Sequence, residues 1–171
     1  MFVAVWPTES VLSVLSGATL TSRTPELRWV PPTNWHVTLA FLGFVPDDEH
    51  HELVAALRSI TPSASPCIAT LGPETLVLGG HVLCVPVSGL DELARAVREY
   101  SAPFSRSADR DESFVGHLTL GRARRGRAVP HVVTGVAIST AWSVTEFRLV
   151  SSTTGPRGAE YSPTAFVRLD G

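Results

Sequence analysis

Short apolar runs, broken by proline and glycine, alternate along the chain with three stretches in which apolar residues recur at helical spacing. The helical stretches run from Thr8 to Gly17, from Asp47 to Ile60 and from Asp91 to Tyr100. The apolar runs predict strands at residues 2–6, 28–30, 37–44, 67–71, 75–78, 82–87, 114–120, 144–150 and 165–169. This order of elements, with tight turns between neighbouring strands, predicts an α+β fold with largely antiparallel sheets.

One four-residue pattern occurs twice, as His36-Val37-Thr38-Leu39 and, 81 positions later, as His117-Leu118-Thr119-Leu120. Because successive side chains of a strand point to opposite faces, each copy places a histidine and a threonine on one face and two aliphatic residues on the other. A single histidine in an apolar strand is usually a packed residue, so the repetition is what favours catalysis. If the two copies face each other, two imidazoles and two hydroxyls line a cleft that suits an anion.

Length and composition narrow the class of protein. A chain of 171 residues predicts one domain over residues 1–171, and a motif spacing of about half the chain predicts two similar lobes. With 14 basic and 16 acidic residues the net charge is −2, so any binding of a polyanion must be local.

The two cysteines, Cys67 and Cys84, form neither a disulfide framework nor a metal-binding array. Neither a signal peptide nor an apolar stretch of about 20 residues is found, so we expect a cytoplasmic protein that does not enter a membrane.

One stretch of the sequence begins like a metal-binding motif. His50-His51-Glu52 starts like the helix of a zinc protease, but Ala55 stands where the second histidine ligand is required. We interpret these residues as a solvated first helical turn. No glycine-rich phosphate loop or nucleotide-binding fingerprint is present, and the sequence predicts neither a metal nor a cofactor.

The densest positive stretch, residues 122–127, follows the second motif directly and contains four arginines. Such a stretch is usually a solvated loop, but its place at the mouth of the expected cleft favours contact with phosphate. Strand alternation opposes this, because Arg122 lies five residues after His117 and falls on the opposite face of a regular strand. Arg122 reaches the cleft only if the strand ends or bulges near Gly121.

These residues resemble a known family over the whole chain. Residues 28–43 and 114–122, each holding one copy of the motif, resemble the two motif regions of the two-histidine (2H) phosphoesterase superfamily. Within it they are most similar to the RNA 2',3'-cyclic phosphodiesterases, also called 2'-5' RNA ligases. Residues 2–5 and 144–149, Ser151-Ser152 and Tyr161 also match in order and spacing. The family usually has proline before the second motif histidine, where this chain has Gly116.

The resemblance implies a bilobal, pseudo-two-fold fold with mostly antiparallel sheets around a central cleft and helices outside. It implies hydrolysis of RNA 2',3'-cyclic phosphate ends to 2'-phosphate, with His36 as proton donor and His117 as proton acceptor. Thr38, Thr119 and Arg122 are then the substrate-binding residues, the partner is RNA with a 2',3'-cyclic phosphate end, and the protein is a monomer that needs no metal.

Two alternatives stay open on the sequence alone. In the first, the protein is a phosphodiesterase for small cyclic nucleotides or cyclic sugar-nucleotide phosphates. In the second, it is a non-catalytic protein that binds RNA ends. The paired histidines argue against pure binding, which needs no titratable imidazoles. Trp6 and Trp35 are candidates for stacking on a nucleobase, although core packing is the expected role of Trp6.

Overall fold

The computed structural model describes residues 1–20, 23–60, 66–107, 113–155 and 158–169. Three α-helices are found there: α1 (Glu9–Leu20), α2 (His50–Arg58) and α3 (Asp91–Ser101). Short 3₁₀ turns η1 (Pro32–Asn34), η2 (Asp47–Glu49), η4 (Ala102–Phe104) and η6 (His131–Val133) connect the elements. The strands are β1 (Phe2–Val5), β2 (Leu27–Trp29), β3 (Val37–Phe41), β4 (Cys67–Leu71), β5 (Leu76–Leu78), β6 (Val82–Ser88), β7 (His117–Ala123), β8 (Thr140–Val144), β9 (Glu146–Gly155) and β10 (Gly158–Arg168).

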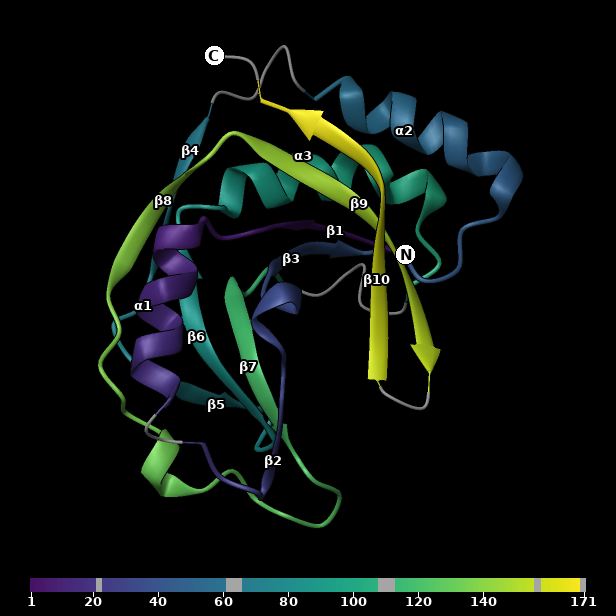
Figure 1. Cartoon of the computed structure of the whole chain (residues 1–171). Coiled ribbons are helices and arrows are strands. Elements are labelled where there is room, and N and C mark those ends of the chain that lie inside the picture. Colours follow the sequence, from purple (N-terminus) through teal and green to yellow (C-terminus); the bar gives the residue numbers. More distant parts are fainter. Residues whose placement is uncertain (21–22, 61–65, 108–112, 156–157, 170–171) are drawn as a thin grey trace.

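The strands form one strongly curled sheet in the order β10-β9-β1-β3-β7-β6-β4-β8, with β2 paired to β7 and β5 paired to β6 (Figure 1). Every strand pair that the structure describes is antiparallel, as the sequence predicts. The two motif strands, β3 and β7, are central neighbours and meet through the pair Val37 and Leu118. Each has three further strands on its outer side, so the expected pseudo-two-fold arrangement holds.

Figure 1 shows α2 and α3 together on one side of β1 and β3, and α1 near β6 and β8. Helix α3 packs against β3 and α2, while α1 packs against β8. Val37, Leu39, Leu118 and Leu120 are at most 2% exposed and belong to the main apolar core. The motif histidines and threonines therefore face the opposite, concave side of the sheet.

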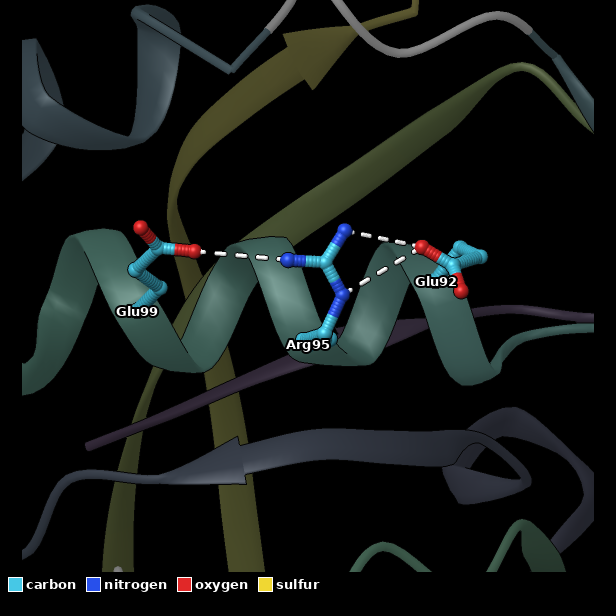
Figure 2. A network of polar contacts seen from close by, with 3 residues as sticks. All are labelled: Glu92, Arg95 and Glu99. Carbon is cyan, nitrogen blue, oxygen red and sulfur yellow. Dashed lines mark hydrogen bonds and ion pairs between the residues drawn. The ribbon is translucent and has the colours of Figure 1, made fainter.

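Helix α3 shows the division between its two faces clearly. Leu93, Ala94 and Val97 are buried, whereas Arg95 on the outer face lies between Glu92 and Glu99 at 2.8 and 3.5 Å (Figure 2). These ion pairs are exposed to solvent, so they contribute little to stability. Their charges lie on the outside of the helix and leave the concave face of the sheet to other residues.

The structure corrects several boundaries that the sequence predicts. Helix α1 does not end at Gly17 but continues to Leu20, with the Thr19 hydroxyl donating a hydrogen bond to the Leu15 carbonyl oxygen at 2.8 Å. The sequence predicts no strand between residues 150 and 165, but residues 151–155 and 158–164 belong to β9 and β10, which pair with each other; residues 156–157 lie outside the described part of the chain. The second motif strand begins at His117 rather than at residue 114, and β8 was not expected. None of the described helices has the length and apolar character needed to cross a membrane.

Candidate active site

Each motif strand carries a β-bulge immediately after its threonine. In β3, Thr38 and Ala40 pair with consecutive residues of β1, so Leu39 is the extra residue. In β7, Thr119 and Gly121 pair with consecutive residues of β6, so Leu120 is the extra residue. Because a bulge inserts one residue, it reverses the alternation beyond it. The expected bulge near Gly121 is therefore confirmed, and it returns Arg122 to the face that carries His117.

The concave face holds a groove of about 760 Å³ between the two motif strands. All five predicted site residues line it: His36, Thr38, His117, Thr119 and Arg122. The structure describes no hydrogen bond from the Thr38 or Thr119 hydroxyl to another described residue, so both hydroxyls are available to a substrate. The structure thus brings these five side chains to one groove, and their role as a site remains a prediction.

The two imidazoles are held in the same way. Nδ1 of His36 is 2.7 Å from the carbonyl oxygen of Asn34, and Nδ1 of His117 is 2.8 Å from that of Val115. A carbonyl oxygen only accepts, so each Nδ1 carries a hydrogen and donates it. Each Nε2 is therefore the nitrogen left to exchange a proton. The two histidines thus have matching tautomers, as a two-histidine acid–base pair requires.

The surroundings of the two histidines differ. The His36 ring stacks on the rings of Phe2 and Trp6, at centroid distances of 5.0 and 5.2 Å and with interplanar angles of 28°. Tyr161 from β10 contacts it edge-on at 5.3 Å. The described residues place no comparable aromatic ring against His117. Packing against three aromatic rings therefore restrains the orientation of His36.

This enclosure affects the titration of His36. Burial lowers the pKa of His36 below its usual value, because the charged imidazolium loses water. The hydrogen bond to the Asn34 carbonyl oxygen opposes this and raises the pKa, while the nearby His117 and Arg122 charges lower it further.

A second layer supports Trp6 from behind. The guanidinium of Arg148 lies over the Trp6 ring at 5.1 Å and over the Phe166 ring at the same distance. Its NH2 also pairs with Glu146 at 2.9 Å. Such cation–π contacts restrain the indole. The stack that runs from Phe166 through Arg148 and Trp6 to His36 links the outer strands to the groove.

Gly116 lies where the backbone of β6 approaches closely. A Cβ at this position would meet the carbonyl oxygen of Val87 at 2.1 Å, which no real contact allows. The Val87 N–H also donates to the Gly116 carbonyl oxygen at 2.8 Å. The residue before His117 is thus held by strand β6, so this chain does not need the proline that is usual in the resembling family.

The two tryptophans that the sequence offers as candidates for stacking on a nucleobase make other contacts in the structure. Trp35 is fully buried in the core, and Trp6 is engaged with His36. Phe41 and Phe44 instead line the groove with exposed fractions of 53% and 76%. Phe41 stands 81 positions before Arg122, so extending the repeat beyond the four-residue motif finds it.

His50 also departs from its interpretation as part of a solvated helical turn. It is half-buried, lines the groove, and its Nε2 is buried without a partner among the described residues. His51 and Glu52 are exposed, as expected. Within the described ranges, no three His, Cys, Asp or Glu side chains gather as they would around a metal ion.

Comparison with known proteins agrees with this architecture. The family described as LigT like Phosphoesterase matches residues 9–71. An RNA 2',3'-cyclic phosphodiesterase of Geobacillus stearothermophilus is 30% identical over 159 residues, which are 86% of this chain and 50% of that protein. The chain therefore spans about half the length of this curated relative.

Two crystal structures match nearly the whole chain. A Thermus thermophilus protein superposes with a TM-score of 0.86 at 26% identity, covering 98% of this chain and 96% of the other. Escherichia coli LigT in complex with 3'-AMP superposes with a TM-score of 0.80 at 25% identity, covering 99% and 97%. Together with the paired histidine motifs in one groove, these matches identify a LigT-like phosphoesterase domain, of the two-histidine (2H) type.

Proposed function

We propose that this protein hydrolyses 2',3'-cyclic phosphate ends of RNA to 2'-phosphate ends by metal-independent acid–base catalysis. The observation that carries the proposal is the pair of bulged motif strands, which brings His36, His117 and Arg122 to one groove. The Geobacillus relative, named an RNA 2',3'-cyclic phosphodiesterase, supports the choice of substrate.

Opening a cyclic phosphodiester with water requires two proton transfers. One group removes a proton from the attacking water, and another gives a proton to the ribose oxygen that leaves. In the proposed mechanism His117 Nε2 accepts the proton of water, and His36 Nε2 donates to the ribose O3'. The bond from phosphorus to O3' breaks while the bond to the water oxygen forms, which leaves the phosphate on O2'.

The enclosure of His36 fits the donor role once substrate is bound. Burial lowers the pKa of His36 in the free protein, and the anionic phosphodiester then draws a proton to it. A donor whose pKa is low gives its proton readily to a developing alkoxide. The packed ring also keeps one orientation toward the leaving oxygen.

Negative charge on the phosphate oxygens increases toward the pentacoordinate transition state. The Thr38 and Thr119 hydroxyls donate hydrogen bonds to these oxygens in the proposal, and the Arg122 guanidinium offers two parallel donors. Donors that are already in place need no reorganisation at the moment of reaction. The terminal nucleobase lies against Phe41, the exposed aromatic ring at the rim of the groove.

An assay with three substrates tests the function. The protein is given a short RNA ending in a 2',3'-cyclic phosphate, a 2',3'-cyclic mononucleotide and a 3',5'-cyclic mononucleotide, each with and without EDTA. We expect hydrolysis of the first two to 2'-phosphates, unaffected by EDTA, and no turnover of the third.

Four results would overturn parts of the proposal. Turnover of the small cyclic nucleotides alone favours the alternative small-molecule phosphodiesterase. Binding of the RNA end without any turnover identifies a non-catalytic binding protein. Loss of activity in EDTA that one added metal restores excludes the metal-independent mechanism, and a 3'-phosphate product would reverse the positions of donor and acceptor.

A further inference from the structure

Two arginines lie directly opposite each other on neighbouring strands at one end of the groove. Arg28 of β2 pairs with Arg122 of β7 in the antiparallel register. Directly paired residues point to the same face of a sheet, with Cβ atoms about 4.5–5.5 Å apart. The neighbours Leu27 and Trp29 point to the other face, where Leu27 is buried in the core. The guanidinium of Arg28 therefore shares the face of the Arg122 guanidinium.

No acidic side chain among the described residues offsets this pair of like charges. Neither Arg28 nor Arg122 forms an ion pair with a described residue, unlike Arg95, Arg106 and Arg148 on other elements. Like charges placed opposite each other on a sheet are destabilising. The pair is therefore a site of concentrated positive charge whose natural complement is an anion from outside the protein.

The position of Arg28 separates it from the reacting phosphate. Arg122 and Val30 line the groove, whereas Arg28, two residues before Val30, lies just outside it. The chain from β2 to β3 runs along one edge of β7, so Arg28 is level with Arg122 and several residues away from His36. A phosphate bound at Arg28 is next to the one bound at Arg122, toward the open end of the groove.

The arginines of the following loop are placed less favourably. Nε of Arg124 donates to the Pro25 carbonyl oxygen at 2.9 Å, and the Arg124 N–H donates to that of Glu26 at 3.1 Å. Arg124 thereby ties the loop to the chain that enters β2. Arg125 lies in the turn that the Arg127 N–H closes onto the Arg124 carbonyl oxygen. Arg28, by contrast, lies on a strand directly opposite Arg122.

From this juxtaposition we propose that Arg28 binds the internucleotide phosphate that precedes the reacting cyclic phosphate. The inference rests on the proposed function and makes it more specific: the preferred substrate is the end of an RNA chain rather than a cyclic mononucleotide. Arg122 and Arg28 together bind two successive phosphates. Arg28 is a specificity-determining residue, because a mononucleotide has no second phosphate to reach it.

The test compares Arg28→Gln with Arg125→Gln, a control that removes the same charge from the nearby turn. Each is assayed on a trinucleotide ending in a 2',3'-cyclic phosphate and on a 2',3'-cyclic mononucleotide. For Arg28→Gln we expect KM for the trinucleotide to rise roughly three- to tenfold, as for an exposed charge-assisted contact. The slope of log affinity against log salt should fall by about 0.7. KM for the mononucleotide should stay unchanged, and Arg125→Gln should affect neither substrate.

A binding arm keeps the inference separate from the proposed function. The affinities of the native protein and of Arg28→Gln are measured for a trinucleotide with a 2'-phosphate end and for a 2'-mononucleotide. If the native protein turns over no substrate, the proposed function fails, and this arm still decides the inference. Equal losses on both ligands would show that Arg28 contacts the terminal phosphate, and no loss on either would show that it binds no phosphate; both outcomes overturn the proposal. The melting temperature of Arg28→Gln should not fall, since a repulsive pair is removed, whereas a fall would reveal a structural role.

Discussion

The indole of Trp6 lies stacked on the imidazole of His36, with ring centroids 5.2 Å apart and planes inclined by 28°. Phe2 also stacks on this imidazole, whereas no described aromatic ring packs against His117, so only one of the two groove histidines has an aromatic enclosure. The pseudo-two-fold symmetry of the motif strands therefore does not extend to the surroundings of the histidines. This asymmetry is the structural basis for assigning them different roles.

The Trp6 stack leads to a prediction about the pH–rate profile. Because the pKa of His36 is lowered mainly by burial, we expect its titration to set the low-pH limb of a bell-shaped kcat/KM profile. Replacing Trp6 by Leu admits water, which raises the pKa of His36 toward about 6.5. The low-pH limb should then move to higher pH, so that activity is lost earlier as the pH falls. The direction holds whichever histidine is the donor, because the profile reports the protonation of the pair.

Phe166→Leu is the matched control for this experiment. Phe166 contacts the far side of Arg148, so its replacement thins the same stack without uncovering His36. Titration of the His36 ring protons by NMR should show the pKa shift in Trp6→Leu and none in Phe166→Leu. An unchanged low-pH limb and an unchanged His36 titration in Trp6→Leu would contradict the role given to the indole.

The sequence identifies the motif residues, but it does not show which face of the sheet the residues after each motif occupy. The repeat predicts His36 and His117 on one face because strand alternation is a local rule. Strand alternation alone would place Arg122 on the face opposite His117. Only the pairing with β6 shows the bulge at Leu120, which returns Arg122 to the face of His117. The same bulge at Leu39 explains why Phe41 was missed as a groove residue.

Other features of the site depend on contacts between distant parts of the chain. Trp6 reaches His36 because β1 lies beside β3, and Tyr161 reaches it from the final hairpin. Trp35 adjoins the motif histidine in sequence and is nevertheless buried in the core. No local pattern distinguishes these tryptophans, since Trp6 ends one predicted strand and Trp35 lies just before another.

Gly116 provides a second prediction, on stability and catalysis together. In Gly116→Ala the new Cβ meets the Val87 carbonyl oxygen at 2.1 Å, so β7 must move away from β6. We expect a loss of roughly 1–3 kcal/mol in the free energy of unfolding, together with a fall in kcat as His117 shifts. Chemical denaturation and steady-state kinetics measure the two effects.

Gly17→Ala is the control for this substitution. Gly17 lies inside α1 and nothing stands within 4 Å of its potential Cβ. This substitution should stabilise the protein by about 0.5–1 kcal/mol, because alanine loses less backbone freedom in a helix, and it should leave kcat unchanged. If Gly116→Ala kept native stability and kcat, the close approach of β6 would not be what positions His117.

A third prediction concerns Phe41. Its ring is 53% exposed at the groove, and it touches Phe2 with centroids 6.2 Å apart. If it stacks on the terminal nucleobase, Phe41→Ala should weaken kcat/KM by the equivalent of about 1–3 kcal/mol on both mononucleotide and RNA substrates. Phe41→Tyr, which keeps the ring, should retain most of the activity. Ile68→Ala, at an apolar site 57% exposed on β4, should change nothing. Equal activity of Phe41→Ala and the native protein would show that the nucleobase does not stack on Phe41.

The last prediction separates the chemical and packing roles of the two histidines. His36→Ala and His117→Ala should each lower kcat by roughly 10²–10⁴, the range for losing a general acid or base. The double variant should be little slower than either single one, because the two groups act together.

The stabilities of the two single variants should differ. His36→Ala removes the ring that packs against Phe2 and Trp6, so it should cost about 1–2 kcal/mol of unfolding free energy. His117→Ala removes a ring that packs against no described aromatic residue, so its denaturation midpoint should stay near the native one. Near-native kcat in either variant would make that histidine structural, and equal stability losses would mean that the aromatic enclosure of His36 contributes nothing to the fold.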